Sequence, residues 1–432
     1  MNRCAAAAVA LLVTTFPLAA TADCDLADPN CVTFVPLGSL DGGAFESTVS
    51  GLSWDGLMAV GTSTSQNSTP RGEGFLWDPG TGIQGLGSLT GGAFQSQANA
   101  IHKTASGSWI GGGASSTLTG SAMEAAIYFT GSGSWEALGS LAVGSPRSMI
   151  YALDASGEIE AGSSSSPESG GTQQQAAVRN ASAWEALETP PNAVPRGEAY
   201  GVDALGTVIV GRTATASSGS NKREAARWSP DSVEILRFPG GGAAEGQARA
   251  IDPSGAFIVG QARNSQNLLE AFAWSQGTMT GLGDLDGGAF ESEARAVATE
   301  GSVVVGRGTT AVGPRAFIWK PGEGMRSLRE VFEEISGTDL GTWKLEEATA
   351  ISRDGRVVAG NGRNPNNQPE AWVLTLPEPT AIGLQCAVIL ALAGLARARR
   401  PGAHSRAGSP ASGNELAWMG SRIHPSGPRS SS

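Results

Sequence analysis

Histidine, tyrosine and cysteine are scarce in this sequence of 432 residues, which contains three, three and four of them. His404 and His424 lie near the C-terminus, so His102 is the only imidazole in the body of the chain. A Ser-His-Asp triad or a histidine-based metal site would depend on that one side chain. The sequence therefore predicts no catalytic residue, no metal site and no cofactor.

Segments with a helical period are almost absent between residues 32 and 376. A single short stretch, Leu328 to Ile335, has the pattern of a helical turn, which makes this an all-β sequence. Glycine is abundant, at 61 residues, but it follows no Gly-X-Y period, which excludes collagen. Many tight turns are the remaining explanation.

The C-terminal end of the chain is basic, whereas the rest is acidic. The formal net charge is −11, and six arginines against one glutamate lie from Arg397 onward, so the remaining chain is more acidic still. An acidic body repels phosphate backbones, and nucleic acid is excluded as an expected partner. The charge favours neutral glycans, cations or basic partners.

One segment recurs seven times. Its clearest copy runs from Leu282 to Trp319, LGDLDGGAFESEARAVATEGSVVVGRGTTAVGPRAFIW. The copies begin at intervals of 46 to 52 residues, near Leu37, Leu86, Leu138, Leu187, Leu236, Leu282 and Leu328. Periods of this length are typical of the four-stranded blades of β-propellers.

Each copy divides into four short strands, here called a, b, c and d. In the copy at Leu282 they are predicted at Glu293–Val297, Val303–Arg307, Ala316–Trp319 and Met325–Leu328. Every a–b turn contains a glycine, which supplies the positive φ of a tight hairpin, at Gly56, Gly107, Gly157, Gly206, Gly255, Gly301 and Gly355. Strand c ends with a tryptophan in four copies, at Trp77, Trp228, Trp274 and Trp319. We expect these tryptophans to lie in the core between blades.

The two ends of the repeat array fit together. The last copy stops after its strand c at Leu374, while Val32–Leu37 has the pattern of a strand d without a blade of its own. Pairing these strands closes the ring and removes exposed sheet edges. The sequence thus predicts a propeller of seven four-stranded blades over residues 23–376, closed by its N-terminal strand.

The N-terminus has the features of a secretory signal peptide at residues 1–22. Arg3 precedes an apolar run, and small residues lead to a predicted cleavage after Ala22. Asp23 stands where a lipoprotein signal needs a small residue, which argues against lipidation of Cys24. In an oxidising compartment Cys24 and Cys31 would form a disulfide, the alternative being two free thiols.

The repeats resemble a known family. LGSLDGGAFESTVSGLSWDGLMAVG, LGSLTGGAFQSQANAI and LGDLDGGAFESEARAV, each followed by an aromatic-rich strand such as Ala271–Trp274, resemble the extracellular HAF repeats over about residues 35 to 376. The resemblance is weaker in the third and fourth copies. It implies secretion and a propeller-like fold, and it supplies no activity and no catalytic residues.

A second resemblance covers residues 377–400. Pro377, Glu378 and Pro379, an apolar run at 381–396, and then Arg397, Arg399 and Arg400 resemble a PEP-CTERM signal, the tag read by exosortase-type membrane enzymes of Gram-negative bacteria that have an exopolysaccharide matrix. The run is shorter than the ~20 residues of a stable transmembrane helix, which suits a provisional anchor. The alternative is a permanent membrane tail. Residues 401–432 are rich in Ser, Gly, Pro and Arg and are predicted to be disordered.

The middle of strand a varies between copies, whereas its neighbours are mostly small. The residues there are Ser50, Asn99, Tyr151, Tyr200, Arg249, Arg295 and Thr349. Strand a is innermost in propellers, and Tyr and Arg are suited to stacking on sugars or binding acidic groups. We therefore predict a ligand site in the channel at Tyr151, Tyr200, Arg249 and Arg295. The alternative is that these side chains only fill space between blades.

Together these observations favour an exported, non-enzymatic protein of the cell surface or extracellular matrix. Its propeller would be a scaffold that binds exopolysaccharide or other surface proteins. The alternative function is an extracellular hydrolase or lyase acting on glycans. Such an enzyme would need an irregular carboxylate, Tyr and Arg cluster in one copy, and the repeated carboxylates, such as Asp286 with Glu291, are better explained as structural turns.

Overall fold

The computed structural model describes residues 31–377 apart from 69, 142–146, 169–172, 181–182, 219–221 and 231. All of these belong to one compact unit. The predicted signal peptide 1–22 with its cleavage site at Ala22, Cys24, and residues 378–432 with Glu378, Pro379, the predicted membrane helix 381–396 and the arginine cluster lie outside the described residues. Among the described helices, none has the length and hydropathy needed to cross a membrane.

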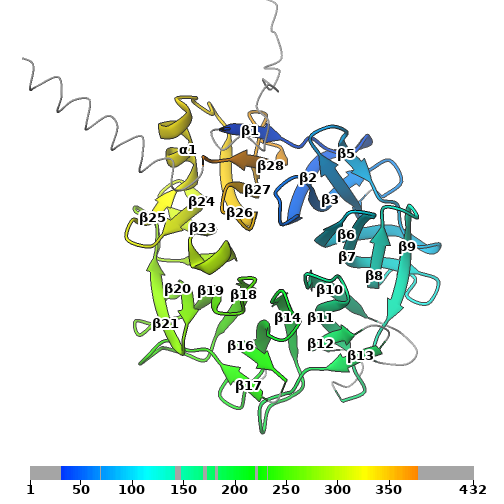
Figure 1. Ribbon diagram of the computed structural model, residues 1–432, viewed down its shortest axis with the longest axis horizontal. Helices are drawn as coiled ribbons and strands as arrows, with labels where there is room; N and C mark the ends of the chain where they lie inside the picture. The colour runs from blue at the N-terminus through cyan, green and yellow to red at the C-terminus, as the bar shows by residue number, and fades with distance from the viewer. Residues whose placement is uncertain are drawn as a thin grey trace, which may run out of the picture. The chain divides into compact units, whose positions relative to one another are not determined.

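Within the described residues the strands form seven antiparallel sheets of four strands each, arranged as blades around a ring (Figure 1). The innermost strands, a, are β2 (Gly42–Leu52), β6 (Gly91–Thr104), β10 (Ser148–Leu153), β14 (Gly197–Val202), β18 (Gly246–Ile251), β22 (Ser292–Val297) and β26 (Lys344–Ile351). The b strands are β3 (Ala59–Ser65), β7 (Gly107–Ser116), β11 (Ile159–Ser165), β15 (Ile209–Thr213), β19 (Phe257–Arg263), β23 (Val304–Thr310) and β27 (Val357–Arg363).

The outer half of each blade consists of strands c and d. The c strands are β4 (Glu73–Asp78), β8 (Glu124–Phe129), β12 (Gln174–Asn180), β16 (Glu224–Ser229), β20 (Leu269–Ser275), β24 (Gly313–Lys320) and β28 (Pro369–Thr375). The d strands are β5 (Gly82–Gly85), β9 (Ser134–Gly139), β13 (Ala183–Ala186), β17 (Ser232–Ile235), β21 (Thr278–Gly283), β25 (Gly324–Ser327) and β1 (Thr33–Pro36). The predicted seven-bladed, all-β propeller is confirmed.

Ring closure occurs as the sequence predicts. The N-terminal β1 pairs with β28 of the last blade, with Phe34 opposite Leu374, and the two strands lie side by side in Figure 1. The ring of Phe34 packs against Phe332, Trp343 and Trp372, with ring centroids 6.3, 5.1 and 6.4 Å away. Phe332 belongs to α1 (Leu328–Ser336), which lies where the sequence predicts a helical turn.

Serine and glycine residues of the repeated segment join neighbouring blades. At four blade junctions a serine of strand a donates a hydrogen bond to the carbonyl of a glycine nine residues earlier. Its Oγ also accepts one, 2.9 to 3.1 Å long, from a backbone N–H of strand c in the preceding blade. The serines are Ser47, Ser96, Ser148 and Ser292. Their recurrence in the sequence therefore follows from blade packing.

Every strand a contains a β-bulge at its middle position, where the register with strand b shifts by one residue. At the bulge, strand a approaches strand b closely. A Cβ added to the residue of strand b that faces the bulge would lie only 1.9 to 2.2 Å from a carbonyl oxygen of strand a. That residue is glycine in all seven blades, at Gly61, Gly112, Gly162, Gly211, Gly260, Gly306 and Gly360. A bulge re-aims the extra side chain, and here it turns that side chain toward the ring axis.

Other local predictions are also confirmed. All seven a–b turn glycines have positive φ, between 67° and 145°. Trp77, Trp228 and Trp274 are buried between blades, and Trp319 is partly buried against the same kind of core. Cys31 is buried and disulfide-bonded. Because Cys24 lies outside the described residues, its pairing with Cys31 stays a prediction.

Candidate functional site

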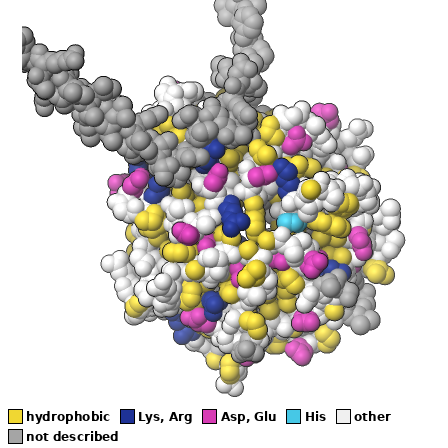
Figure 2. Space-filling view, in the orientation of Figure 1, with side chains coloured by type: hydrophobic (Ala, Val, Ile, Leu, Met, Phe, Trp, Pro, Cys, Tyr) yellow, Lys and Arg dark blue, Asp and Glu magenta, His cyan; other side chains and the backbone are white. Residues whose placement is uncertain are grey.

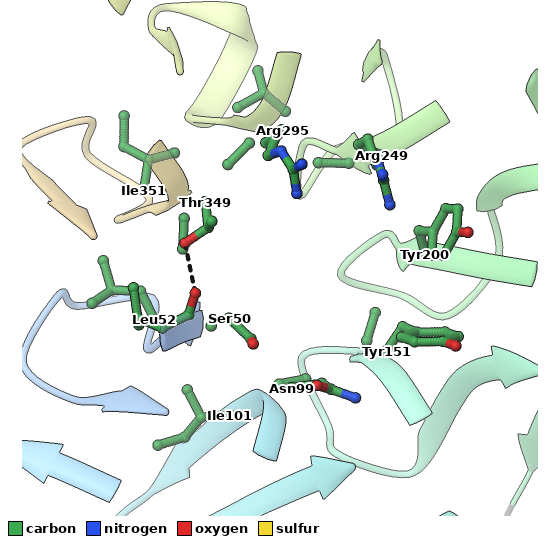
Figure 3. Close-up of a pocket in the computed structure, with 18 of the residues that line it drawn as sticks. Ser50, Leu52, Asn99, Ile101, Tyr151, Tyr200, Arg249, Arg295, Thr349 and Ile351 are labelled. Atoms are coloured by element: carbon green, nitrogen blue, oxygen red, sulfur yellow. Dashed lines mark hydrogen bonds between the residues drawn. The ribbon is translucent and has the colours of Figure 1, made fainter. Parts of the chain in front are cut away.

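The bulge residues line a cavity of about 540 Å³ on the ring axis (Figure 3). It is bounded by side chains from the described blades, and all seven bulge positions contribute to it: Ser50, Asn99, Tyr151, Tyr200, Arg249, Arg295 and Thr349. Each residue is carried by a different strand a, so the site is assembled from segments up to about 300 residues apart in sequence. The structure therefore brings together the four predicted residues, while ligand binding by them stays a prediction.

The cavity has two layers. Two positions after the bulge residue, each strand a carries an aliphatic side chain that also lines the cavity. These side chains form an apolar collar toward the a–b turns: Leu52, Ile101, Leu153, Val202, Ile251, Val297 and Ile351. The layer at the bulges is polar. A bound molecule would thus meet apolar contacts at one end and hydrogen-bonding groups at the other.

Tyr151, Tyr200, Arg249 and Arg295 lie on four consecutive blades. The rings of Tyr151 and Tyr200 meet edge to face, with centroids 5.3 Å apart. The guanidinium of Arg249 lies 4.8 Å from the centre of the Tyr200 ring, within cation–π range. In Figure 3 these side chains form one wall of the cavity, and Ser50 and Asn99 lie on the opposite side.

Glu293 on β22 lies behind this wall and contacts three arginines. Its carboxylate oxygens lie 2.6 Å from Arg249 Nε, 3.1 Å from Arg295 Nη2 and 3.2 Å from Arg307 Nε. Its side chain is 2% exposed. Burial alone would raise the pKa of Glu293, but the arginines, Arg249 foremost, outweigh burial and lower the pKa. The carboxylate therefore stays ionised at neutral pH.

Two further carboxylates continue this network. Glu198 on β14 receives two hydrogen bonds from Arg212, of 2.7 and 3.2 Å. Glu347 on β26 lies 3.2 Å from Arg295 Nη2 and accepts a 3.0 Å hydrogen bond from Asn361. The charged wall extends over the blades whose inner strands are β14, β18, β22 and β26.

Sequence reasoning did not identify these network residues. The signal is present, however, in the position two residues before each bulge, which holds Thr48, Gln97, Met149, Glu198, Gln247, Glu293 and Glu347. Carboxylates occur there only in blades four, six and seven. Comparison of the copies at this position, rather than only at the bulge, would have indicated the charged side of the ring.

Burial raises the pKa of Tyr151 and of Tyr200 above that of a free phenol, and in Tyr200 the nearby Glu198 adds to the effect. Both hydroxyls therefore remain protonated at neutral pH. Glu160 is a buried carboxyl that does not line the cavity. Burial raises the pKa of Glu160 to about 7 despite the ion pair with Arg179.

A second aromatic and arginine pair lines the cavity near the a–b turns. The guanidinium of Arg353 lies 5.5 Å from the Trp54 ring centre, and both residues contact the cavity. Figure 2 shows positively charged side chains at the centre of this view of the ring, surrounded mainly by hydrophobic ones. In the part of the chain that the structure describes, no group of three or more His, Cys, Asp or Glu side chains is arranged to hold a metal ion.

Comparisons with known proteins give a weak structural likeness only. No protein-family model matches the chain, and no curated protein matches it in sequence. TolB from Acinetobacter baumannii aligns at 11% identity over 75% of this chain and 64% of its own, with a TM-score of 0.39. The gluconolactonase XC5397 from Xanthomonas campestris aligns at 11% identity over 80% and 90%, with a TM-score of 0.36.

An acylaminoacyl peptidase also aligns, at 9% identity over 77% of this chain and 52% of its own, with a TM-score of 0.41. The chain thus spans less than two thirds of the length of this peptidase and of TolB. At such TM-scores the likenesses carry no inference about function. The propeller is established here by the topology of its own sheets.

Proposed function

We propose that this protein is an exported, non-enzymatic binding protein whose propeller holds a saccharide in its central cavity, at the cell surface or in the extracellular matrix of a Gram-negative bacterium. The observation that carries the proposal is the wall formed by Tyr151, Tyr200, Arg249 and Arg295. Aromatic rings and guanidinium groups stack on flat surfaces and donate several hydrogen bonds, which suits sugar rings and their substituents.

The size and lining of the cavity support a small ligand. Its volume of about 540 Å³ lies within the range of about 300 to 1,000 Å³ that is typical of ligand pockets. The apolar collar offers contacts for the C–H faces of a sugar ring, while the polar layer offers hydrogen bonds. Sugars present both kinds of surface.

The carboxyl groups and hydroxyls in and near the cavity favour saccharide binding over the alternative function, cleavage of glycans by a hydrolase or lyase. Glycosidases commonly use a pair of carboxyl groups, one of which donates a proton. Among the described residues that line the cavity, Glu347 is the only one with a carboxylate. Glu293 lies nearby but has a lowered pKa, so it is a poor proton donor, and the raised pKa values of Tyr151 and Tyr200 make these hydroxyls poor nucleophiles.

Saccharide binding is tested by blocking the cavity without touching the charged wall. Ser50 lies on the opposite side and is exposed, so Ser50→Trp would place a large ring in the cavity. We expect the wild-type protein to bind oligosaccharides prepared from bacterial exopolysaccharide, and the Ser50→Trp variant to bind at least about 10-fold more weakly because the ligand volume is occupied. Isothermal titration calorimetry measures both affinities.

The matched control is Ser132→Trp, which adds the same ring on the exposed loop between β8 and β9. It should bind as the wild type does. Equal binding by the Ser50→Trp variant would show that the cavity is not the site. Shortened or unsaturated oligosaccharides after incubation with the wild type would favour the enzyme instead.

Export and sorting rest on the N-terminal signal and on the PEP-CTERM resemblance, and both are part of the proposal. We expect the protein isolated from its own organism to start at Asp23 and to end near Pro377 or Glu378, in the surface or medium fraction. Intact-mass spectrometry of each cell fraction measures this. A mass that still includes residues 397–432, found in the inner membrane, would instead indicate a permanently anchored protein.

A further inference from the structure

The charge of the cavity is opposite in sign to that of the whole chain. The chain has a formal charge of −11, but the charged residues that line the cavity within the described part are three arginines and one glutamate: Arg249, Arg295, Arg353 and Glu347. Because the cavity is partly screened from water, this excess of positive charge is felt more strongly than it would be on the surface. An anionic group is the complement to such a site.

Arg249 has hydrogen-bonding capacity left for a ligand. Its Nε donates to Glu293, and its two terminal nitrogens donate to no other described residue. The guanidinium is held over Tyr200, and Figure 3 shows its end directed into the cavity. A guanidinium with its terminal nitrogens unused presents the fork that binds a carboxylate with two parallel hydrogen bonds.

The carboxylates behind the wall are shared between several arginines. Arg249, Arg295 and Arg307 all contact the carboxylate of Glu293, and Arg307 also lies 3.8 Å from Glu291. Arg295 also contacts Glu347, which lies at the cavity surface. The side chains of Arg249 and Arg295 are 25% and 23% exposed, so part of their hydration has been lost. A bound anion would restore the lost interactions.

The opposite wall is of a different character. Ser50 and Asn99 are uncharged, and the collar below them is aliphatic. A small inorganic anion would use only the arginine side, whereas a sugar that carries an acid group would use the whole cavity. This asymmetry is set by the sequence of the individual blades, since the backbone repeats around the ring.

On the basis of the proposed saccharide binding, we propose that the ligand is an acidic saccharide, and that Arg249 and Arg295 bind the carboxylate of a uronic acid residue while the sugar ring lies against Tyr151, Tyr200 and the aliphatic collar. The site then selects acidic saccharides over neutral ones. Arg249 determines this preference for charge.

The test compares one sugar with and without its charge. Oligomers of galacturonate, glucuronate and mannuronate are titrated into the full-length protein by calorimetry, each beside its methyl ester, which removes the charge and keeps the ring. We expect at least one acid form to bind about 10- to 100-fold more tightly than its ester, because hydrogen bonds between charged groups are lost in the ester. This comparison needs no variant.

The Arg249→Gln variant should reduce that preference to near one, because it weakens binding of the acid form much more than binding of the ester. The Arg326→Gln variant, which removes an exposed arginine outside the cavity, should keep the full preference. Equal binding of acid and ester by the wild type would overturn the inference and leave saccharide binding intact. Displacement of the acid sugar by an equal concentration of inorganic sulfate would also overturn it, and no binding of either form by any oligomer would contradict both proposals.

Discussion

Deletion of residues 24–36 is expected to lower the melting temperature by about 10 °C or more, because it removes the strand that closes the ring. β28 would lose its partner β1, and the aromatic cluster of Phe332, Trp343 and Trp372 would lose Phe34. Loss of a fully buried phenylalanine side chain costs about 3 to 5 kcal/mol, and Phe34 is partly buried, but the deletion also removes the whole pairing of β1 with β28. Each kcal/mol corresponds to about 2 to 4 °C in domains of roughly 150 to 250 residues and to less in this larger domain, so the expected shift reflects the combined losses. The open sheet edge would also favour aggregation.

The matched control is a deletion of residues 24–30, which leaves β1 in place. Differential scanning calorimetry in reducing buffer removes the Cys31 disulfide from the comparison. We expect the shorter deletion to melt close to the full-length protein. An equal loss in both variants would assign the stability to the segment before β1, and no loss in the longer deletion would show that the ring does not depend on this closure.

Replacement of Glu293 by alanine is expected to cost about 3 to 5 kcal/mol in the free energy of unfolding, since it leaves three partly buried arginines without their shared carboxylate. Urea denaturation measures the change. Glu291 is the matched control, because it is two residues away and 49% exposed, and it lies 3.8 Å from Arg307. We expect Glu291→Ala to cost at most about 1 kcal/mol. Equal effects of the two substitutions would contradict the role of Glu293 as the centre of the network.

The stabilisation that Glu293 contributes is expected to depend on pH. Because its pKa in the folded protein is lower than its ordinary value of 4.5, Glu293 binds fewer protons in the folded than in the unfolded state as the pH falls below about 4.5. Its stabilising contribution is therefore fully present above that pH and is lost as the pH falls through the folded-state pKa. The stability difference between the wild type and Glu293→Gln should be constant from about pH 6 to 8 and shrink in acid. A difference that persisted undiminished to pH 2 would argue against this assignment.

The architecture could be predicted from the sequence because it repeats. Seven copies of one segment indicate seven blades, and a last copy without a strand d together with a lone strand at Val32–Leu37 indicates closure. The predicted strands of the copy at Leu282 agree with β22, β23, β24 and β25 to within three residues at each end. The glycine of the a–b turn recurs in all seven copies, so the predicted strand boundaries do not depend on a single chance match.

Part of the candidate site could be predicted for the same reason. Aligned copies place Tyr151, Tyr200, Arg249 and Arg295 at one position of an inner strand, and the structure places them in the cavity lining. The bulge that directs these side chains toward the cavity could not be predicted from the local sequence, because a bulge depends on how two strands pair. It is visible only indirectly, in the glycine that every strand b keeps at the facing position.

The sequence by itself determined the number of blades, the closing strand, the turn glycines and the identity of the variable inner residues, because each of these follows from local pattern or from repetition. Only the tertiary structure decided that Glu293 is shared by Arg249, Arg295 and Arg307, and that the Arg249 guanidinium lies over Tyr200. Arg249 and Glu293 are 44 residues apart and belong to neighbouring blades. The charge of the cavity depends on which side chains the blade-to-blade geometry brings within hydrogen-bonding distance, and no local pattern contains that information.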